Sequence, residues 1–273
     1  MENQVCVKPE IFSQYPELMC GVTTRSFFSQ TFSEGIDREK PDAREKAMLE
    51  SGIFFWFEKI AFSQQTHSDR VAVIESDWFI WEADALVTRQ KNLALVIKTA
   101  DCGQIFLFDP VAEIVGAVHA GWKGHSLRIL EKTVSSMINL WAKAERLLCF
   151  IGPSIEARNY EVGADGTDFG QWFGDRTLLP HWEPGIPIDS IDWSYPDISS
   201  RAGRDYKHLD SRKFFDGKYE SKRQLLRMEV PENQIECSDL CSFEEENLYS
   251  YRRDGANAGR MMWIIGMRDS NQL

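Results

Sequence analysis

Residues 94–119 have the sequence ALVIKTADCGQIFLFDPVAEIVGAVH, and this stretch decides the fold class. It contains three short runs rich in Val, Ile, Leu and Phe, namely Ala94–Thr99, Gln104–Phe108 and Ile114–His119. Asp, Gly and Pro bound these runs, which is typical of buried β-strands. The stretch therefore predicts three consecutive strands in the middle of the chain.

The second and third strands are predicted to form a hairpin around Asp109-Pro110. Asp at the first and Pro at the second position favour a type I turn, and four-residue hairpin loops are often built on that turn. With Asp109–Ala112 as the loop, the antiparallel register sets Cys102 opposite His119. Directly paired residues have Cβ atoms about 4.5–5.5 Å apart, so we expect these two side chains within reach of one metal ion.

Working outward, the chain alternates further strands with helices. The apolar positions of Ser126–Ala142 recur at spacings of three and four, which predicts an amphipathic helix. Its first-turn neighbour His125 is expected to be solvated. The other predicted elements are the strands Ala83–Thr88 and Leu147–Ile151 and a second helix at about Lys213–Met228.

Charge and composition limit the partners and the compartment. The 31 Lys and Arg against 42 Asp and Glu give a net charge of −11, which disfavours nucleic acid and a polybasic membrane-surface role. The longest apolar runs, Ile53–Phe57 and Leu93–Ile97, are far shorter than a membrane span. Six scattered cysteines and no basic leader before an apolar stretch favour a reduced, cytoplasmic protein.

No linker divides the chain, so we predict one domain over residues 1–273. The stretch Glu183–Asp205 is rich in Pro, Asp, Ser and Gly, and we expect it to be a long surface excursion from that domain.

Three residues form the candidate metal site. His119 ends a predicted strand, Cys102 precedes one, and His67 lies in a polar patch. Each has a structural alternative, as a satisfied histidine or a small core cysteine. Together they form a two-histidine, one-cysteine set, and zinc with three protein ligands keeps a fourth position open for water or substrate. Blue copper also uses such ligands, but usually clusters them in one loop of a β-sandwich, and here a helix follows.

The C-terminal loop offers a second polar cluster. Arg252 and Arg253 are candidates for binding an oxyanion, because guanidinium groups bind oxyanions bidentately. The alternative is a structural ion-pair network with Asp254, and the sequence leaves both open.

Taken in order, six motifs resemble the laccase-domain family, also called the YfiH-type or polyphenol oxidase family. The resemblance extends from about residue 21 to residue 266. The His-Ala-Gly-Trp-Lys-Gly motif, with Ala-Asp-Cys upstream, is its most specific part. The six motifs are Gln65–His67, Ala83–Thr88, Thr99–Cys102, His119–Gly124, Ile151–Ile155 and Ser250–Gly255, the last followed by Gly259–Met261.

The resemblance implies an α/β (α+β) fold with mixed and antiparallel β-sheets flanked by helices, and a zinc site at His67, Cys102 and His119. It implies purine nucleoside and phosphate as small-molecule substrates: phosphorolysis of adenosine, inosine or methylthioadenosine, and deamination of adenosine. The family's older label, copper-dependent oxidation of phenols, is the alternative. Multicopper oxidases need many histidines, and this chain has five. A third alternative is a non-catalytic metal-binding protein.

Charged residues receive provisional roles, and for two arginines the resemblance supplies the reason. Arg25 matches an early arginine of the family and Arg44 a second one, so with Lys123 they are the phosphate- and substrate-binding candidates. The usual zinc-deaminase signature is absent, so another acid/base is needed, and Asp101 is the nearest one in sequence to the ligand Cys102. These two are the catalytic candidates, and the alternative for Asp101 is a structural role as a hydrogen-bond acceptor in a turn. Ser26–Ser29 stand where the family usually has a Gly-Gly pair, which predicts an altered substrate pocket. No protein partner is predicted.

Overall fold

The computed structural model describes residues 9–25, 57–75, 79–80, 82–162, 178–179 and 213–269. Within it the chain forms two compact units, Met1–Glu156 with Gly217–Leu273, and Ala157–Asp216. Arg44, Ser26–Ser29 and the predicted excursion Glu183–Asp205 lie outside the described residues. The single domain over residues 1–273 stays a prediction.

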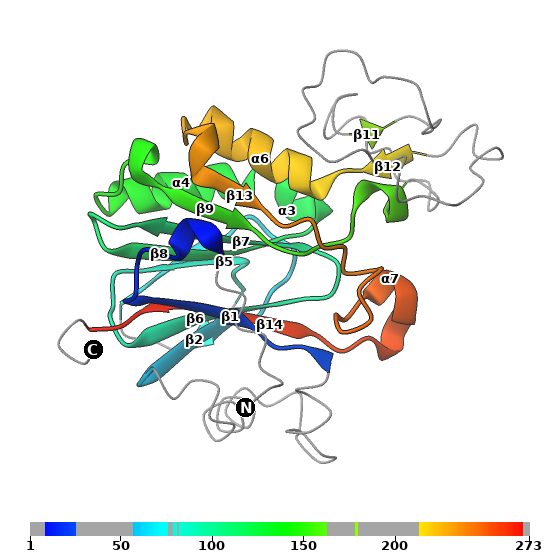
Figure 1. The fold of residues 1–273 in the computed structure, drawn as a ribbon, viewed down its shortest axis with the longest axis horizontal. Helices are drawn as coiled ribbons and strands as arrows, with labels where there is room; N and C mark the ends of the chain where they lie inside the picture. Colours follow the sequence, from blue (N-terminus) through cyan, green and yellow to red (C-terminus); the bar gives the residue numbers. More distant parts are fainter. Residues whose placement is uncertain are drawn as a thin grey trace. The chain divides into compact units, whose positions relative to one another are not determined.

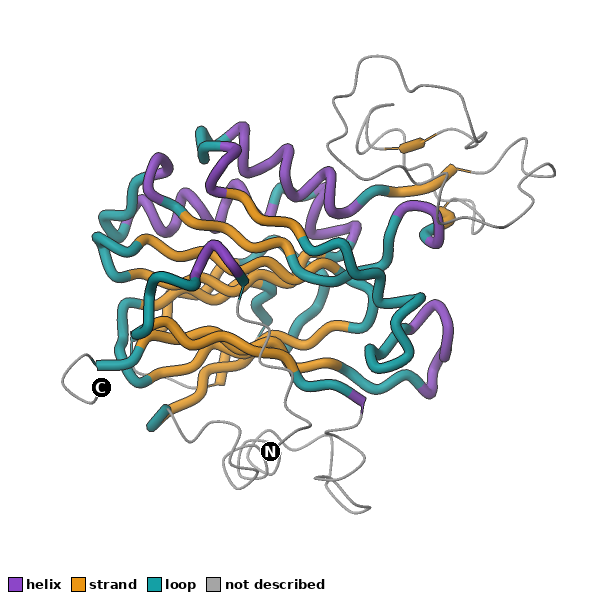
Figure 2. The backbone as a smooth tube through the Cα atoms, in the orientation of Figure 1, coloured by secondary structure: helices purple, strands orange, loops and turns teal. Residues whose placement is uncertain are grey.

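The first unit contains two mixed β-sheets, which appear as two layers in Figure 2. The six-stranded sheet has the order β13-β9-β7-β8-β5-β3; its outer pairs β13–β9 and β3–β5 are parallel and its inner pairs antiparallel. The five-stranded sheet has the order β1-β14-β6-β2-β4. The strands are β1 (Leu18–Val22), β2 (Lys59–Ser63), β3 (Val71–Ile74), β4 (Phe79–Ile80), β5 (Ala85–Thr88), β6 (Leu93–Thr99), β7 (Gly103–Asp109), β8 (Ile114–Ala120), β9 (Leu148–Ile151), β13 (Ile235–Cys237) and β14 (Met261–Met267).

Helices cover one face of the six-stranded sheet, with α4 and α6 lying over it in Figure 1. The α-helices are α3 (Trp122–Ser126), α4 (Ile129–Asn139), α6 (Gly217–Arg227) and α7 (Tyr251–Asp254). The 3-10 helices of this unit are η1 (Glu10–Phe12), η2 (Ala144–Arg146), η5 (Glu232–Gln234) and η6 (Gly255–Asn257). None of the helices in the described part of the chain is long and apolar enough to cross a lipid bilayer.

Two apolar cores follow from this arrangement. The first lies between the sheets and includes Phe106, Phe108 and Trp263, all at most 1 % exposed. The second lies under α4, where Leu130 and Val134 pack on the outer face of the six-stranded sheet. Because strand side chains alternate between faces, β7 and β8 supply residues to both cores and are buried along their whole length.

The second unit contains a small antiparallel sheet of the order β10-β12-β11. Its strands are β10 (Glu161–Val162), β11 (Leu178–Leu179) and β12 (Lys213–Phe215), and η3 (Ala157–Asn159) precedes them.

The expected fold class is confirmed, and the expected strands are present with ends shifted by one or two residues. The expected helix Ser126–Ala142 is wrong in its bounds: Arg128 has a left-handed φ of 63° and separates α3 from α4. The helix expected from Lys213 begins only at Gly217, because Lys213–Phe215 form β12.

The β7–β8 hairpin is antiparallel as predicted, but its predicted register is wrong by two residues. His119 pairs with Gln104, and Gly103 pairs with Ala120, so Cys102 lies one step beyond the last pair of the ladder. Direct pairing of Cys102 with His119 is therefore not what brings these residues together.

The turn residue Asp109 explains the shift. It remains the last residue of β7 and pairs with Ile114, so the loop is Pro110–Glu113. Its buried carboxylate accepts hydrogen bonds from the backbone N–H groups of Val111 and Ala112 at 2.9 Å each. The sequence rule treated Asp109 as the first residue of the loop, whereas its side chain organises the loop from within the strand.

Candidate metal centre

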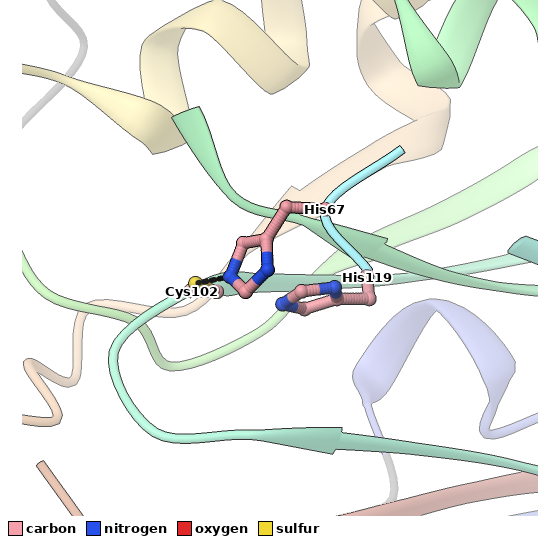
Figure 3. A group of neighbouring side chains, drawn as sticks. All are labelled: His67, Cys102 and His119. Atoms are coloured by element: carbon pink, nitrogen blue, oxygen red, sulfur yellow. Dashed lines mark hydrogen bonds between the residues drawn. The ribbon is translucent and has the colours of Figure 1, made fainter. Parts of the chain in front are cut away.

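The three predicted ligands His67, Cys102 and His119 meet at one end of the six-stranded sheet (Figure 3). His67 lies in the turn before β3, Cys102 in the bend between β6 and β7, and His119 near the end of β8. Their potential ligand atoms lie within 4.8 Å of one another. In the described part of the chain, no other group of three or more His, Cys, Asp or Glu side chains has this proximity.

The cluster has the dimensions that a zinc ion requires. The Sγ atom of Cys102 is 3.8 Å from Nε2 of His67, and the two imidazole centroids are 4.8 Å apart at 75°. Tetrahedral zinc with Zn–N bonds of about 2.0–2.1 Å and Zn–S bonds of about 2.3 Å separates its ligand atoms by roughly 3.3–3.8 Å. From separations of up to 4.8 Å, the side chains need to close by at most about 1.5 Å to satisfy that geometry, which rotamer adjustment can supply, so the residues present fit the ion.

Exposure differs among the three ligands in a way that suits a reactive site. His119 is buried, Cys102 is half-buried and His67 is exposed. The cluster therefore has an inner side anchored in the core and an outer side that solvent reaches. A small molecule approaching from solvent would meet His67 first.

Two of the residues that shape the site have unusual backbone conformations. His67 has a φ of 59° and Asp101, next to Cys102, has a φ of 85°. Such conformations cost non-glycine residues about 1–3 kcal/mol each and persist only where the surroundings impose them. Both bends direct a ligand toward the cluster.

Gly121 leaves the space that the ligands occupy. A Cβ atom at this position would lie 2.7 Å from Cδ2 of His67 and 3.2 Å from Sγ of Cys102. Its φ of −75° and ψ of 170° are ordinary extended values, so glycine is required here for space and not for conformation.

Asp84, which the sequence analysis did not single out, lies behind His119. It is fully buried, and its Oδ1 accepts a hydrogen bond from Nδ1 of His119 at 2.7 Å. Because this bond engages Nδ1, Nε2 of His119 is the nitrogen that a metal would bind, on displacing its proton. Asp84 belongs to the Ala83–Thr88 motif, and an acidic residue directly before a buried strand was the pattern that could have revealed it.

Electrostatics favour the thiolate form of Cys102. Burial by itself raises the pKa of this thiol, but the neighbouring positive charge of His119 lowers it to about 6. Burial lowers the pKa of His119, whereas the Cys102 thiolate and Asp84 raise it to about 9. For the Asp84 carboxyl, burial by itself would raise the pKa, but hydrogen bonds from His119 and Ser68 lower it to about 2. Because metals bind thiolates and not thiols, the cluster holds Cys102 in its ligand form.

Asp101, a predicted catalytic residue, is buried and makes hydrogen bonds through both carboxylate oxygens. Ser242 Oγ donates to Oδ1 at 2.7 Å. Ser250 Oγ and the backbone N–H of Arg252 donate to Oδ2 at 3.0 and 2.7 Å. These bonds tie the Cys102 bend to the C-terminal loop, so Asp101 anchors this ligand's backbone; its role in proton transfer stays a prediction.

Arg25 and Lys123, two of the predicted phosphate-binding residues, lie in the described part of the chain. Arg25 donates to Asp254 at 2.6 Å and stacks on the ring of Tyr249 at 5.2 Å. Lys123 lies in the first turn of α3, with Nζ 5.4 Å from the Trp122 ring centroid.

Arg253 forms the structural ion pair with Asp254 that the sequence left open as the alternative to oxyanion binding. It donates to both oxygens of Asp254 and to four backbone carbonyls of the loop. Its guanidinium group therefore holds the loop together.

The expectation that the His125 side chain is solvated is wrong. Its side chain is 1 % exposed, and burial lowers its pKa to about 4. Since α3 packs between β8 and α6, and Gln224 of α6 donates to the His125 carbonyl, this face of α3 is turned toward the core.

Comparison with known proteins gives consistent matches. The family model described as "Multi-copper polyphenol oxidoreductase laccase" matches residues 20–176 and 194–268. A purine nucleoside phosphorylase of Deinococcus radiodurans is 32% identical over 253 residues, covering 90% of this chain and 85% of the relative. One of Clostridium acetobutylicum is 32% identical over 217 residues, covering 77% and 78%.

Solved structures share the fold. A hypothetical protein YfiH of Bacillus licheniformis superposes with a TM-score of 0.71 at 24% identity, covering 93% of this chain and 94% of that one. YlmD from Geobacillus stearothermophilus gives a TM-score of 0.70 at 22% identity, covering 96% and 94%. At these identities the likeness shows the fold.

Proposed function

The chain belongs to the family described as multi-copper polyphenol oxidoreductase laccase, and we propose that it is a zinc-dependent purine nucleoside phosphorylase with adenosine deaminase activity. The observation that carries the proposal is the proximity of His67, Cys102 and His119. A zinc ion held by three protein ligands keeps a fourth position open for substrate or water. The names of the relatives, purine nucleoside phosphorylase, support the substrate class.

Zinc suits this ligand set better than several coppers. Catalytic zinc sites use three protein ligands drawn from thiolates, imidazoles and carboxylates, and the described residues contain one cluster of three such side chains. The chain has five histidines, of which three, His67, His119 and His125, lie in the described part, and His125 is not in the cluster. Copper-dependent phenol oxidation remains the second candidate because the family description names it.

The proposed reactions define what the chain's own residues must do. In phosphorolysis a phosphate oxygen bonds to C1′ of the ribose as the C1′–N9 bond breaks, which releases ribose 1-phosphate and the free base. Arg25, Arg44 and Lys123 are the proposed phosphate-binding residues. Arg25 is partly exposed and would exchange its bond to Asp254 for one to phosphate. A bound zinc ion would supply a Lewis acid and lower the pKa of water toward about 7.

Deamination replaces the C6 amino group of adenine by oxygen from water, with release of ammonia. The proton carrier that we propose is Asp101, beside the ligand Cys102. It would have to release one of the donors that now hold its two carboxylate oxygens.

The five cysteines of the described part are free thiols. They support a reducing, cytoplasmic location as part of the proposal.

One experiment tests the proposal directly. Protein of measured zinc and copper content is incubated with adenosine, with and without phosphate, and the products are separated chromatographically. Phosphate-dependent adenine and ribose 1-phosphate support phosphorolysis, and inosine supports deamination. Zinc-loaded protein that forms neither product refutes the proposal, and stoichiometric copper with a visible chromophore favours the oxidase.

A further inference from the structure

A single buried carboxylate contacts the segments of both histidine ligands. Oδ1 of Asp84 accepts hydrogen bonds from His119 Nδ1 at 2.7 Å and from the backbone N–H of His67 at 3.1 Å. Oδ2 accepts from the backbone N–H of Thr66 at 3.2 Å and of Ser68 at 2.7 Å, and from Ser68 Oγ at 2.7 Å. Five donors therefore converge on one side chain that has no exposed surface.

We propose that Asp84 is the positioning residue of the metal centre, setting the tautomer of His119 and the left-handed turn of His67 at the same time. The inference rests on the metal site of the proposed function but not on its substrate. Asp84 does not belong to the ligand cluster. It acts by placing two ligands, so that the site exists before the ion arrives.

The left-handed conformation of His67 explains why such an anchor is needed. Three consecutive backbone N–H groups, those of Thr66, His67 and Ser68, point to one carboxylate only when the turn curls around it. That curl includes the φ of 59° at His67, which an unrestrained histidine avoids. Without the negative charge at its centre, the turn would relax and carry the exposed imidazole away.

The other side of the turn is held separately. The Gln65 amide donates to the Lys98 carbonyl and accepts from the Lys98 N–H, both at 2.7 Å. Gln65 thus attaches the turn to β6 of the five-stranded sheet, while Asp84 attaches it beside β5 of the six-stranded sheet. Loss of Asp84 would free the His67 end of the turn and leave the Gln65 end in place.

The donor pattern requires two acceptor oxygens, which makes Asp84→Asn a sharp test. If the amide nitrogen replaces Oδ2, it faces the N–H groups of Thr66 and Ser68 and repels them. If it replaces Oδ1, it faces Nδ1 of His119 and the N–H of His67, and His119 must then carry its proton on Nε2. The first orientation opens the turn and the second blocks the metal-binding nitrogen, so neither preserves the site.

The test is the zinc affinity of the purified protein, measured by competition with a chromophoric chelator. Asp84→Asn is expected to weaken Zn²⁺ binding by about 10–100-fold, the usual effect of losing a partner that orients a ligand. Ser68→Ala removes one of the five donors and should give a smaller loss. The matched control is Thr88→Val: Thr88 is fully buried on β5, the strand that directly follows Asp84, and its hydroxyl donates to the Ile74 carbonyl without contacting either histidine.

Nitrogen-15 NMR of the histidines in the parent and in Asp84→Asn separates positioning from a general structural role. In the zinc-loaded parent, His119 should carry its proton on Nδ1, and folded Asp84→Asn should show either a changed tautomer or a shifted His67 resonance. A parent with the proton on Nε2 of His119 overturns the assignment even if Asp84→Asn does not fold.

The outcomes are distinct. Folded Asp84→Asn with zinc affinity within about threefold of the parent, or an equal loss in Thr88→Val, overturns the role of Asp84 and leaves the proposed function intact. A parent that binds no zinc refutes the metal centre itself and this inference with it.

Discussion

Replacing Gly121 by Ala should separate metal binding from folding stability. The new Cβ would lie 2.7 Å from Cδ2 of His67, about 0.7 Å inside the 3.4 Å at which ordinary contact begins. The Gly121 backbone is extended and accepts alanine without strain, so the clash must be relieved by the His67 ring. That ring is exposed and can move outward without opening the core.

The sizes of the two effects follow from the same geometry. Metal–ligand distances tolerate only about ±0.2 Å, so a retreat of about 0.7 Å removes His67 from the optimal position. We expect zinc affinity to fall at least about tenfold, which corresponds to about 1.4 kcal/mol. The metal-free protein should keep its stability or gain up to about 1 kcal/mol, because alanine restricts the unfolded chain more than glycine does.

The assay pairs chelator competition for Zn²⁺ with urea unfolding of the metal-free protein. Gly21→Ala is the control, since a Cβ there meets nothing within 4 Å. In a His67→Ala background the ring is gone, so Gly121→Ala should cause only a smaller further loss, from the remaining 3.2 Å approach to Sγ of Cys102. The reasoning is refuted if Gly121→Ala binds zinc within about twofold of the parent, well short of the loss expected for a displaced ligand.

Three further predictions address the core, the hairpin and the thiol. Gly152→Ala should destabilise the protein by about 1–3 kcal/mol, because its Cβ would lie 1.1 Å from Nε2 of the buried Gln104; urea unfolding should show most of that loss recovered in a Gln104→Ala background. Burial raises the pKa of Asp109, but hydrogen bonds from Arg146 and the loop backbone hold it below its usual value. Its stabilising contribution is therefore complete above the unfolded pKa of about 3.9 and is lost as pH falls through the lower folded pKa. The parent should have a higher free energy of unfolding than Asp109→Asn at neutral pH. A difference in unfolding free energy that does not shrink in acid would contradict this. Cys102→Ala should abolish zinc binding and purine release together, and product formation without zinc would separate the two.

Much of the fold was predictable from local pattern. The buried strands β6, β7, β8 and β9 are short apolar runs bounded by turn residues, and their existence needed no tertiary information. The hairpin register did need it, since it depends on whether Asp109 serves as a loop residue or as a strand end whose side chain caps the loop. That choice is made by the donors that surround its carboxylate, including Arg146 and the backbone of Lys143.

The helical region after His119 shows the same limit. The apolar spacing of Ser126–Ala142 predicted one helix, but spacing does not reveal that Arg128 adopts a left-handed conformation that divides it. His125 was expected in solvent because it is polar and lies near a helix start. It is buried because α3 has only five residues and packs against neighbours on several sides.

By itself the sequence determined the family, the fold class and the identity of the three candidate ligands, because motif order and apolar periodicity can be read without knowing which residues meet in space. Tertiary structure alone decided how those ligands are held. Asp84, Gly121 and Asp101 act on residues distant in sequence, through hydrogen bonds and steric contacts that exist only once the sheets and the C-terminal loop have packed. A buried carboxylate is stable only where folding supplies its donors, and the donors of Asp84 come from a turn and a strand that meet only in the folded protein.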